Sequence, residues 1–270
     1  MLLAIDSGNT NFEFAVFDGD RLCGSWRTAS DANRTADEYL VWLTQLMGLQ
    51  GLKAEMIDGA IISSVVPAAL YPLASLCSRY FGVDPLIVGR PGVELGIEVR
   101  VEQPEAVGAD RLVNSIAAHE QFGGPLIVVD FGTATSFDVV GSDGAFEGGV
   151  LAPGVNLSLQ AFHLAAAKLP LVRVRMPEQV IGKATEPAME SGIFWGYIGL
   201  VEGLVARIKS EYGAPMKVIA TGGLATLFDR ATPVIEHVDP ELTLRGLLSI
   251  YRTNGGSDVR HGVLEKVRST

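Results

Sequence analysis

Two short stretches of the chain combine residue types that bind phosphate groups and cations. An apolar run ends at Asp6 and continues as Ser-Gly-Asn-Thr10, and a second apolar run ends at Asp130 and continues as Phe-Gly-Thr133. Each apolar run is typical of a buried strand, and the glycine permits a tight turn whose backbone N–H groups can face an anion. The carboxylates can hold Mg²⁺ or another cation, and the threonine hydroxyls can donate hydrogen bonds to phosphate oxygens. The pair predicts nucleotide binding, with one polyphosphate held at opposite ends by two similar halves.

Either turn alone could also begin an ordinary hairpin, because an apolar strand followed by Asp and Gly is common there. Two copies favour the phosphate interpretation, since each lies near the start of one half of the chain, as an internal duplication would place it. The 270 residues suffice for two modest domains at about 100–200 residues each. We therefore predict an N-terminal domain over 1–115 and a C-terminal domain over 116–270.

The charge and the cysteine content argue against several classes of partner and site. A formal net charge of −10 opposes nucleic-acid binding by the surface as a whole, although a local basic site could still hold one small anion. Cys23 and Cys77 are too few for a disulfide framework or a cysteine-based zinc site, and a reducing cytoplasm is the expected location. No apolar run approaches the roughly 18 residues of a membrane-spanning helix, and no basic export signal precedes the first strand. We expect no membrane and no nucleic acid among the partners.

The elements that must position the two turns follow from periodicity and turn signals. The first half is predicted to run βββαβαβ, with a three-stranded meander over 2–28, a helix from Thr35, strand 60–66, helix 68–81 and strand 86–88. Residues 89–107 predict a long loop with one strand at 97–101, and a connection of this length is often functional. A helix is expected to open at Gly108 and to end at Phe122.

The second half is predicted to repeat this order. Its elements are strands 126–130 and 134–140, a strand entering 147–154, helix 155–168, a loop over 169–184, helix 185–212, strand 217–220, a turn at 221–223 into a short helix, and a last helix 242–251. In the long helix, Gly192, Gly196, Gly199 and Gly203 fall on one face. This glycine face, despite its cost in helix propensity, permits close backbone packing, either on the protein's own sheet or on a second subunit.

Several familiar signatures do not occur in the sequence. Gly182-Lys183 is followed by Ala184 and lacks the upstream glycine of a Walker A loop, and there is no Gly-x-Gly-x-x-Gly turn. Asp130-Phe-Gly132 matches a protein-kinase tripeptide, but no His-Arg-Asp loop precedes it. Without a Gly-x-Ser-x-Gly elbow or histidines at metal-ligand spacing, a serine hydrolase and a zinc enzyme are poor fits.

Asp110 and Arg111 are the candidates for catalysis. A carboxylate beside a permanently charged guanidinium can orient a substrate hydroxyl and accept its proton while the arginine binds an anionic tail. In the alternative interpretation, Asp110 only favours the start of its helix through the helix dipole. Thr185 could likewise be an N-cap of the long helix. Gly222 and Gly223 could start a helix or let a nucleotide base or ribose approach the backbone.

Seven motifs occur in order along nearly the whole chain. They are Asp6-x-Gly-Asn-Thr10, Ser63-Ser-Val-Val-Pro67, Gly108-Ala-Asp-Arg111, Asp130-Phe-Gly-Thr-Ala-Thr135, Gly148-Gly-x-x-x-Pro-Gly154, Ile181-Gly-Lys-x-Thr185 and Thr221-Gly-Gly223. Together they resemble the type III pantothenate kinase family. The resemblance implies an α/β protein of the actin, Hsp70 and hexokinase type, with two duplicated ribonuclease-H-like domains and an interdomain nucleotide cleft. It also implies a homodimer that phosphorylates pantothenate with ATP, the first step of coenzyme A biosynthesis.

The resemblance further implies roles for individual residues. Asp110 would accept the proton of the pantothenate primary hydroxyl, Asp130 would hold a monovalent cation, K⁺ or NH₄⁺, and Asp6 could hold Mg²⁺. Pantothenate would be bound by Gly108, Ala109, Asp110, Arg111 and Thr185. ATP would be bound by Asp6, Ser7, Gly8, Asn9, Thr10, Asn11, Phe12, Glu13 and Thr133, with Gly222 and Gly223 near the base or ribose. Glu190 stands where the family pattern leads us to expect Gln.

Two other functions stay open at this level. The same fold could phosphorylate another acceptor, such as a sugar or acetate, or could hydrolyse polyphosphate, because fold does not fix function. Members of the family have also been called transcriptional accessory factors. The acidic charge and the lack of a helix-turn-helix signal oppose direct DNA binding.

Overall fold

The computed structural model describes residues 1–165 and 170–256, which group into two compact units. The first unit contains residues 1–96, 108–113 and the described chain from 243 onward, and the second contains 97–107 and 114–242. Each unit is built on one five-stranded sheet. The division into 1–115 and 116–270 stays a prediction.

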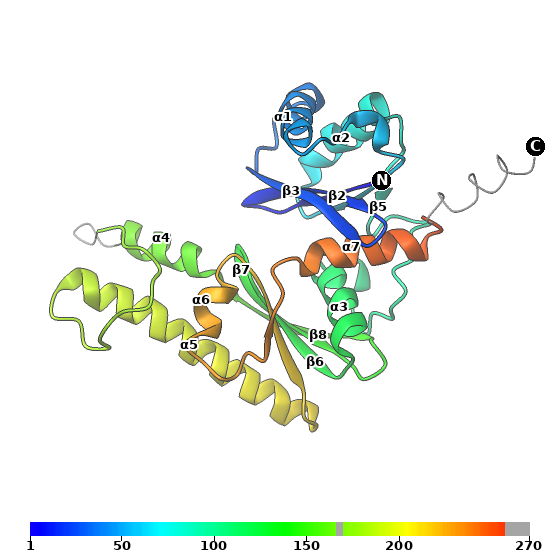
Figure 1. Ribbon diagram of the computed structural model, residues 1–270. Helices are drawn as coiled ribbons and strands as arrows, with labels where there is room; N and C mark the ends of the chain where they lie inside the picture. Colours follow the sequence, from blue (N-terminus) through cyan, green and yellow to red (C-terminus); the bar gives the residue numbers. More distant parts are fainter. Residues whose placement is uncertain (166–169, 257–270) are drawn as a thin grey trace, which may run out of the picture. The chain divides into compact units, whose positions relative to one another are not determined.

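The first unit has the strand order β3-β2-β1-β4-β5 (Figure 1). Its strands are β1 (Leu2–Ser7), β2 (Asn11–Asp18), β3 (Arg21–Ala29), β4 (Gly59–Ser64) and β5 (Leu86–Ile87). The first three form the predicted antiparallel meander, and β4 pairs parallel with β1. The parallel pairing brings the carboxyl ends of β1 and β4 to one edge of the sheet, where the first predicted turn begins.

Two helices cover one face of this sheet, α1 (Ala36–Leu49) and α2 (Pro67–Leu76) (Figure 1). Thr35 caps α1 through a capping box with Glu38, which satisfies backbone donors at the helix start. Alternate strand residues such as Ile5 and Ile62 pack against Tyr39 of α1 in a fully buried apolar core. Because side chains alternate between the faces of a strand, the neighbouring residue Asp6 points to the opposite face.

The opposite face of the first sheet is crossed by α7 (Leu242–Thr253) (Figure 1). Tyr251 lies directly over Gly59 of β4, because a Cβ on that glycine would overlap the tyrosine hydroxyl. Gly246 of α7 likewise lies against the backbone of Val113. These two glycines let a helix from the end of the described chain pack closely within the first unit.

The second unit has the strand order β10-β9-β6-β7-β8. Its strands are β6 (Leu126–Phe131), β7 (Ala134–Val140), β8 (Phe146–Pro153), β9 (Lys217–Gly222) and β10 (His237–Val238). The central strand β6 pairs antiparallel with β7 and parallel with β9, as β1 pairs with β2 and β4. The two sheets therefore repeat one arrangement, which agrees with the predicted duplicated fold.

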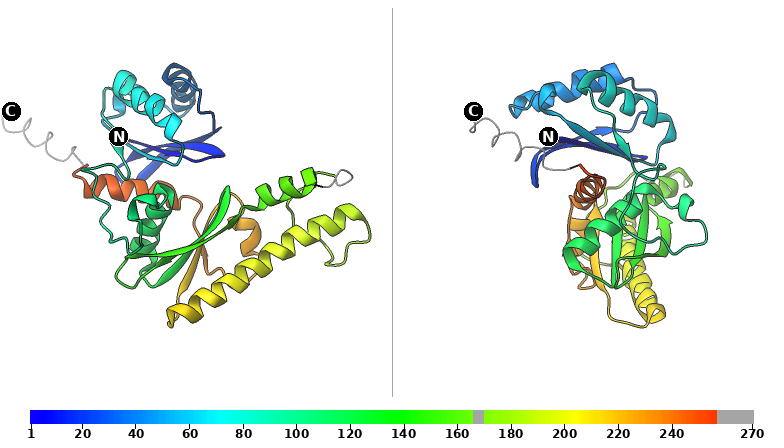
Figure 2. Two further views of the ribbon diagram at one scale, coloured as in Figure 1. Left: turned by 180° about the vertical axis from the view of Figure 1, so that it is seen from behind. Right: turned by 90° about the vertical axis from the view of Figure 1, so that its right-hand side faces the viewer.

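Helices cover both faces of the second sheet. The long helix α5 (Thr185–Tyr212) runs along one face together with α6 (Ala225–Asp229) (Figure 2). Val129 and Phe131 of β6 pack on this side against Phe194 of α5. On the other face, α3 (Ala109–Phe122) packs Ala117 and Ala118 against alternate residues of β6. Asp130 points to this second face, the one that α3 covers.

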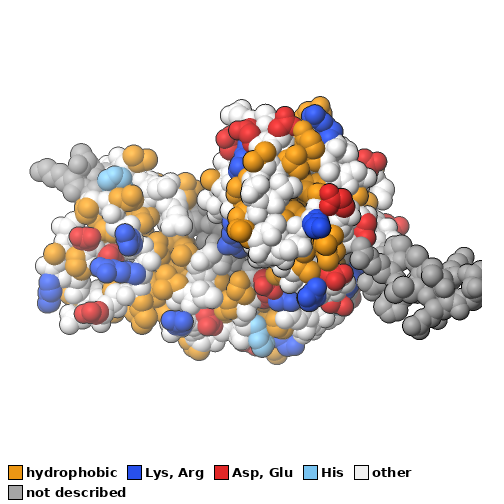
Figure 3. Space-filling view, turned by 45° about the horizontal axis from the view of Figure 1, so that its top comes forward, with side chains coloured by type: hydrophobic (Ala, Val, Ile, Leu, Met, Phe, Trp, Pro, Cys, Tyr) orange, Lys and Arg blue, Asp and Glu red, His pale blue; other side chains and the backbone are white. Residues whose placement is uncertain are grey.

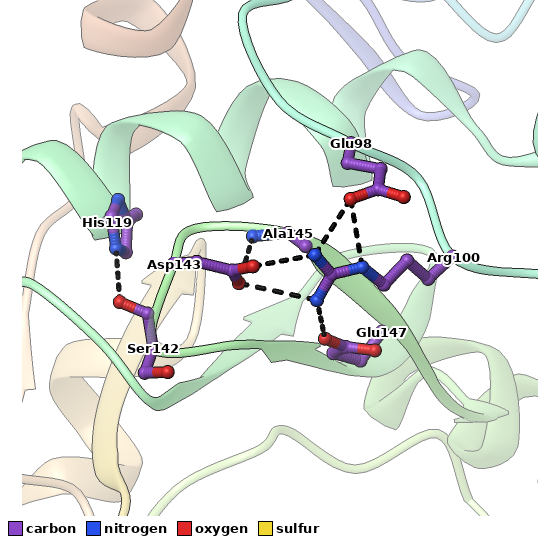
Figure 4. A network of polar contacts seen from close by, with 7 residues as sticks. All are labelled: Glu98, Arg100, His119, Ser142, Asp143, Ala145 and Glu147. Atoms are coloured by element: carbon purple, nitrogen blue, oxygen red, sulfur yellow. Dashed lines mark hydrogen bonds and ion pairs between the residues drawn. The ribbon is translucent and has the colours of Figure 1, made fainter.

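The segment before α3 is attached to the β7–β8 hairpin of the second unit (Figure 4). Val99 forms a parallel bridge with Phe146, and the Arg100 guanidinium contacts Glu98, Asp143 and Glu147 at 2.6–2.7 Å. The hydrogen bonds that Arg100 donates to Glu98, Asp143 and Glu147 raise the pKa of Arg100, and the bond from Arg100 in turn lowers the pKa of the Asp143 carboxyl. This network holds residues 98–100 of the predicted loop against the β7–β8 hairpin.

Most of the predicted elements agree with the structure, and three details do not. The strand predicted at 97–101 is reduced to the isolated bridge of Val99 with Phe146, the first residue of β8. The segment 68–81 ends in a π-helical turn, η2 (Cys77–Phe81), and β10 was not predicted. Helix 155–168 corresponds to α4 (Val155–Ala165), and its last predicted residues lie outside the described chain.

Short 3₁₀ turns occur as η1 (Ala54–Met56) and η3 (Pro104–Ala106). Over the described residues, no helix is both long and apolar enough to cross a membrane.

Candidate functional site

The first predicted turn connects β1 to β2 at the carboxyl end of β1. Gly8 N–H donates to the Asn11 carbonyl at 3.1 Å, and a Cβ on Gly8 would lie only 3.0 Å from that oxygen. Asn9, Thr10 and Asn11 are exposed at the tip of the turn, where a phosphate could reach them. The turn therefore has the tight, glycine-dependent form that a phosphate loop needs.

The other residues predicted for this loop differ in what they can contribute. Asp6 is partly exposed, whereas Ser7 and Phe12 are fully buried. Phe12 belongs to the apolar core against Tyr39, so only its backbone is available to a ligand. Glu13 is engaged by Arg27 at 2.8 Å.

The start of α3 meets the first turn within the first unit. Val65, in the connection from β4 to α2, donates its N–H to the Ser7 carbonyl at 3.0 Å. The Val65 side chain in turn lies 3.7 Å from the position of a Cβ on Gly108. The structure thus brings the first turn, the 63–67 motif and the predicted Gly108–Arg111 motif together at one edge of the sheet.

Asp110 lies in the first turn of α3, half-buried, and its Oδ1 accepts a hydrogen bond from Arg111 N–H at 2.8 Å. Burial raises the pKa of this carboxyl, and the Arg111 bond and charge oppose the rise only in part. Gly108 makes room for the carboxylate, since a Cβ there would lie 2.6 Å from Asp110 Oδ1. A carboxylate with a raised pKa at a helix start is suited to accept a proton from a substrate hydroxyl.

The second predicted turn connects β6 to β7 in the second unit. Gly132 N–H donates to the Ala134 carbonyl at 3.0 Å, and Thr133 is exposed at the tip. Gly154 N–H donates to the Thr133 carbonyl at 3.1 Å, and a Cβ on Gly154 would overlap that oxygen. The first residue of α4, Val155, follows at once, so the positive end of a helix dipole lies beside this turn.

Asp130, at the end of β6, is held by groups from separate parts of the second unit. The buried Asn114 of α3 donates its side-chain amide to Asp130 Oδ2 at 3.3 Å. Gly222 has φ +89° and lies so close that a Cβ would be 2.4 Å from Asp130 Oδ1. Gly223 is exposed, and a Cβ there would meet no atom within 4 Å. Asp130 and Gly222 therefore form one site, whereas Gly223 is open to a ligand.

Thr185 is exposed at the start of α5 and does not act as the predicted N-cap. Ala184 occupies the cap position, and no side chain there bonds to the helix start. Tyr197 holds α5 to the Pro153 carbonyl at 2.9 Å, and Thr185 lies about 18 Å farther along the helix at 1.5 Å per residue. Nearby, the buried Glu190 accepts a bond from Arg175 at 2.8 Å, which accounts for a carboxylate at this position.

The structure adds three residues to which the sequence analysis assigned no role. Asn114 is one, and its signal is its place one turn after Asp110 on α3. The others are hydroxyl residues aligned with the two aspartates on the neighbouring parallel strands. Ser63 pairs with Asp6 between β4 and β1, and Thr221 pairs with Asp130 between β9 and β6.

The donor sets fit small cations of the kind that kinases use. Among the described residues, no three His, Cys, Asp or Glu side chains gather as a metal-binding group. Mg²⁺ in phosphate sites is commonly bound by one or two carboxylates, waters and the substrate phosphates, which the partly exposed Asp6 can match. Asp130 is a single carboxylate with carbonyl and hydroxyl oxygens at the same strand ends. It therefore offers an oxygen-donor site of low charge, which suits a monovalent cation.

The sequence model of type III pantothenate kinase matches residues 2–207 of this chain. A type III pantothenate kinase of Paramagnetospirillum magneticum is 62% identical over 254 residues, which cover 94% of this chain and 98% of the relative. One from Rhodospirillum rubrum is 63% identical over 254 residues, covering 94% and 99% of the two chains.

Solved structures support the fold assignment at low sequence identity. A Baf family protein of Campylobacter jejuni, described as a conserved putative transcriptional activator, superposes with TM-score 0.59 at 18% identity, covering 94% of this chain and 100% of its own. A 2-dehydro-3-deoxygalactonokinase-like protein of Sinorhizobium meliloti gives TM-score 0.57 at 17% identity, covering 94% and 96%. These likenesses concern the fold alone.

Proposed function

The chain belongs to the type III pantothenate kinase family, so its reaction is the ATP-dependent phosphorylation of pantothenate, and we propose that Asp110 accepts the proton of the pantothenate hydroxyl in that reaction. The observation that carries this assignment is the half-buried carboxylate whose pKa is raised by burial. The Arg111 guanidinium, next in the chain, would bind the pantothenate carboxylate. Gly108 and Ala109 would contact the substrate through their backbone.

ATP would be bound by the two turns. Residues 6–13 would supply backbone N–H groups and the exposed side chains of Asn9, Thr10 and Asn11 to the phosphates. Thr133 and the open Gly223 would contact the nucleotide from the second turn and the end of β9. Phosphoryl transfer has a loose transition state, so positioning and neutralisation of charge by these groups should provide most of the catalysis.

The cations belong to the proposal as well. Asp6 would hold Mg²⁺, which supplies charge neutralisation at the phosphates. Asp130 would hold a monovalent cation, K⁺ or NH₄⁺, because its carboxylate is already oriented by Asn114 and Gly222. A cytoplasmic location is part of the same proposal, since ATP, the phosphoryl donor, is available there.

We also propose a homodimer formed through the glycine face of α5. At Gly192, Gly196 and Gly199 a Cβ would meet no atom within 4 Å, so this face does not pack on the sheet of its own subunit. The alternative that it packs there is wrong for these three positions. Exposed apolar side chains also occur on α4 and on the segment before α5, namely Leu157, Phe162, Leu164, Leu171, Val180 and Ile181. Figure 3 shows hydrophobic side chains on the surface at the left of that view. Exposed apolar surface of this kind marks protein interfaces.

A genetic test addresses the function and the catalytic residue together. The wild-type chain and Asp110→Asn would be introduced into a strain that lacks pantothenate kinase activity. Wild type should restore growth and Asp110→Asn should not. Transfer of radiolabelled phosphate from ATP to pantothenate, with a sugar and acetate as competing acceptors, should then give labelled phosphopantothenate alone. Growth restored by Asp110→Asn would contradict the role of Asp110.

A further inference from the structure

Ser63 has a buried hydroxyl that the roles proposed above do not use. Its side chain is fully buried at 0% exposure, and within the described chain its Oγ has no hydrogen-bond partner. A buried polar group without a partner disfavours the folded state, and native proteins rarely retain one without a reason. The question is which group this hydroxyl serves.

The pairing of β1 with β4 limits the answer. Ser63 and Asp6 are partners in parallel strands, so both side chains leave the same face of the sheet at the same level. The strands lie about 4.8 Å apart, which puts the two side chains within reach of each other. On its other side Asp6 is flanked by Glu13 of β2, which Arg27 already engages. Ser63 is thus the neutral donor next to the Asp6 carboxylate.

The second sheet repeats this arrangement. Thr221, which is 2% exposed, is the partner of Asp130 in the parallel pair of β9 and β6. A hydroxyl therefore stands beside the aspartate at the same place in both halves of the duplicated fold. An arrangement repeated at two aspartates argues for a role toward the carboxylates and against a chance polar residue.

We propose that Ser63 is a positioning residue that acts through Asp6. Its hydroxyl donates a hydrogen bond to the Asp6 carboxylate when that carboxylate takes the Mg²⁺ of the bound nucleotide, and so fixes which oxygen faces the cation. Because Ser63 is fully buried whereas Asp6 is partly exposed, the hydroxyl reaches the ligand only through the aspartate. This inference depends on the proposed role of Asp6 in holding Mg²⁺. Hydrogen bonds to a ligating carboxylate typically change metal affinity about 10–100-fold.

The test is a titration of MgCl₂ against binding of a non-hydrolysable ATP analogue, measured by calorimetry. Ser63→Ala should need about 10–100-fold more Mg²⁺ for half-maximal binding, while analogue binding in EDTA stays as in wild type. Its melting temperature without nucleotide should be equal to that of wild type or higher, because an unpaired buried hydroxyl is removed. Ser63→Thr keeps a hydroxyl at this position and should retain the wild-type Mg²⁺ dependence, since Thr221 occupies the matching place beside Asp130.

Thr135→Val is the matched control. The Thr135 hydroxyl is also fully buried and without a partner in the described chain, but it lies on the α5 face of the second sheet, opposite to the face to which Asp130 points. This variant should bind Mg²⁺ and analogue as wild type does. A shift of the same size in Thr135→Val would overturn the proposal, because any buried hydroxyl would then matter equally.

Three further results would also overturn it. If Ser63→Ala shows the wild-type Mg²⁺ dependence while Asp6→Ala shifts the titration, Ser63 has no positioning role. Asp6 would then still be the Mg²⁺ ligand. If Asp6→Ala also leaves the titration unchanged, the assignment of Mg²⁺ to Asp6 fails, and the role of Ser63 fails with it. Equal shifts in Ser63→Ala and Ser63→Thr would point to a packing effect instead of the hydroxyl.

Discussion

Gly222 lies against the Asp130 carboxylate so closely that a Cβ would be 2.4 Å from Oδ1. Its φ of +89° is also one that residues with a side chain rarely adopt. Gly222→Ala should therefore displace Asp130 and lower stability by about 1–3 kcal/mol through overpacking and backbone strain. Activation by KCl should require a higher concentration. Gly223→Ala, which meets no atom within 4 Å, should keep the wild-type melting temperature, and equal melting temperatures for all three proteins would contradict the prediction.

Asp110→Asn should lower kcat by about 10²–10⁴ with the fold intact, the usual range for loss of a general base. Because burial raises the pKa of Asp110, the acid limb of the wild-type kcat/KM profile should lie above the ordinary Asp value of about 3.9. The variant should lack that limb. Steady-state kinetics from pH 4 to 8 would measure both effects. A folded variant with near wild-type turnover would exclude the role.

The same substitution should raise stability at neutral pH. With its pKa raised in the folded state, the carboxyl favours folding below the unfolded-state value of about 3.9, and this contribution is lost as pH rises through the folded-state pKa. At pH 7 the ionised, half-buried carboxylate therefore disfavours the folded state. Asp110→Asn should melt above wild type at pH 7, and the difference should shrink toward pH 4. A lower melting temperature for the variant at pH 7 would show that the Arg111 bond outweighs burial.

Asp6→Ala and Asp130→Ala should both impair the use of ATP, but in different ways. Loss of Asp130 should strongly change the dependence on monovalent cations, because its carboxylate would hold the cation. Loss of Asp6 should change the dependence on Mg²⁺ and leave the KCl activation curve in place. Titration of KCl at saturating Mg²⁺ separates the two. The same KCl activation curve in Asp130→Ala and in wild type would show that Asp130 does not hold the monovalent cation.

Gly196→Leu should yield a folded monomer with weakened pantothenate binding and nearly normal ATP binding. A side chain at Gly196 meets nothing within its own subunit, so overpacking of the protomer is not expected. In an isologous dimer the same glycine lies on both sides, and two leucines would separate the helices. Glu211→Leu, at an exposed position in the last turn of α5, is the control and should stay dimeric. Sedimentation decides, and an intact Gly196→Leu dimer would refute the interface.

The sequence by itself determined the features that depend on neighbours in the chain. The two Asp-Gly turns, the helix that begins after Thr35 and the bounds of α5 follow from local periodicity and turn chemistry, and all lie where they were predicted. The duplicated order was also readable, because each half repeats an apolar strand, a turn and a second strand. The motifs then identified the family, since their order along the chain is specific.

Only the tertiary structure decided which distant residues meet. Ser63 lies beside Asp6, and Thr221 beside Asp130, because of the register of two parallel strand pairs, and a shift of one residue would turn every side chain to the other face. Asn114 reaches Asp130 because α3 packs on the face of the sheet to which Asp130 points. Thr185 fits a cap by residue type, yet the helix begins one residue earlier than a Thr185 cap requires. Pairing register and helix packing are set by burial of the whole core, which no local pattern in the chain encodes.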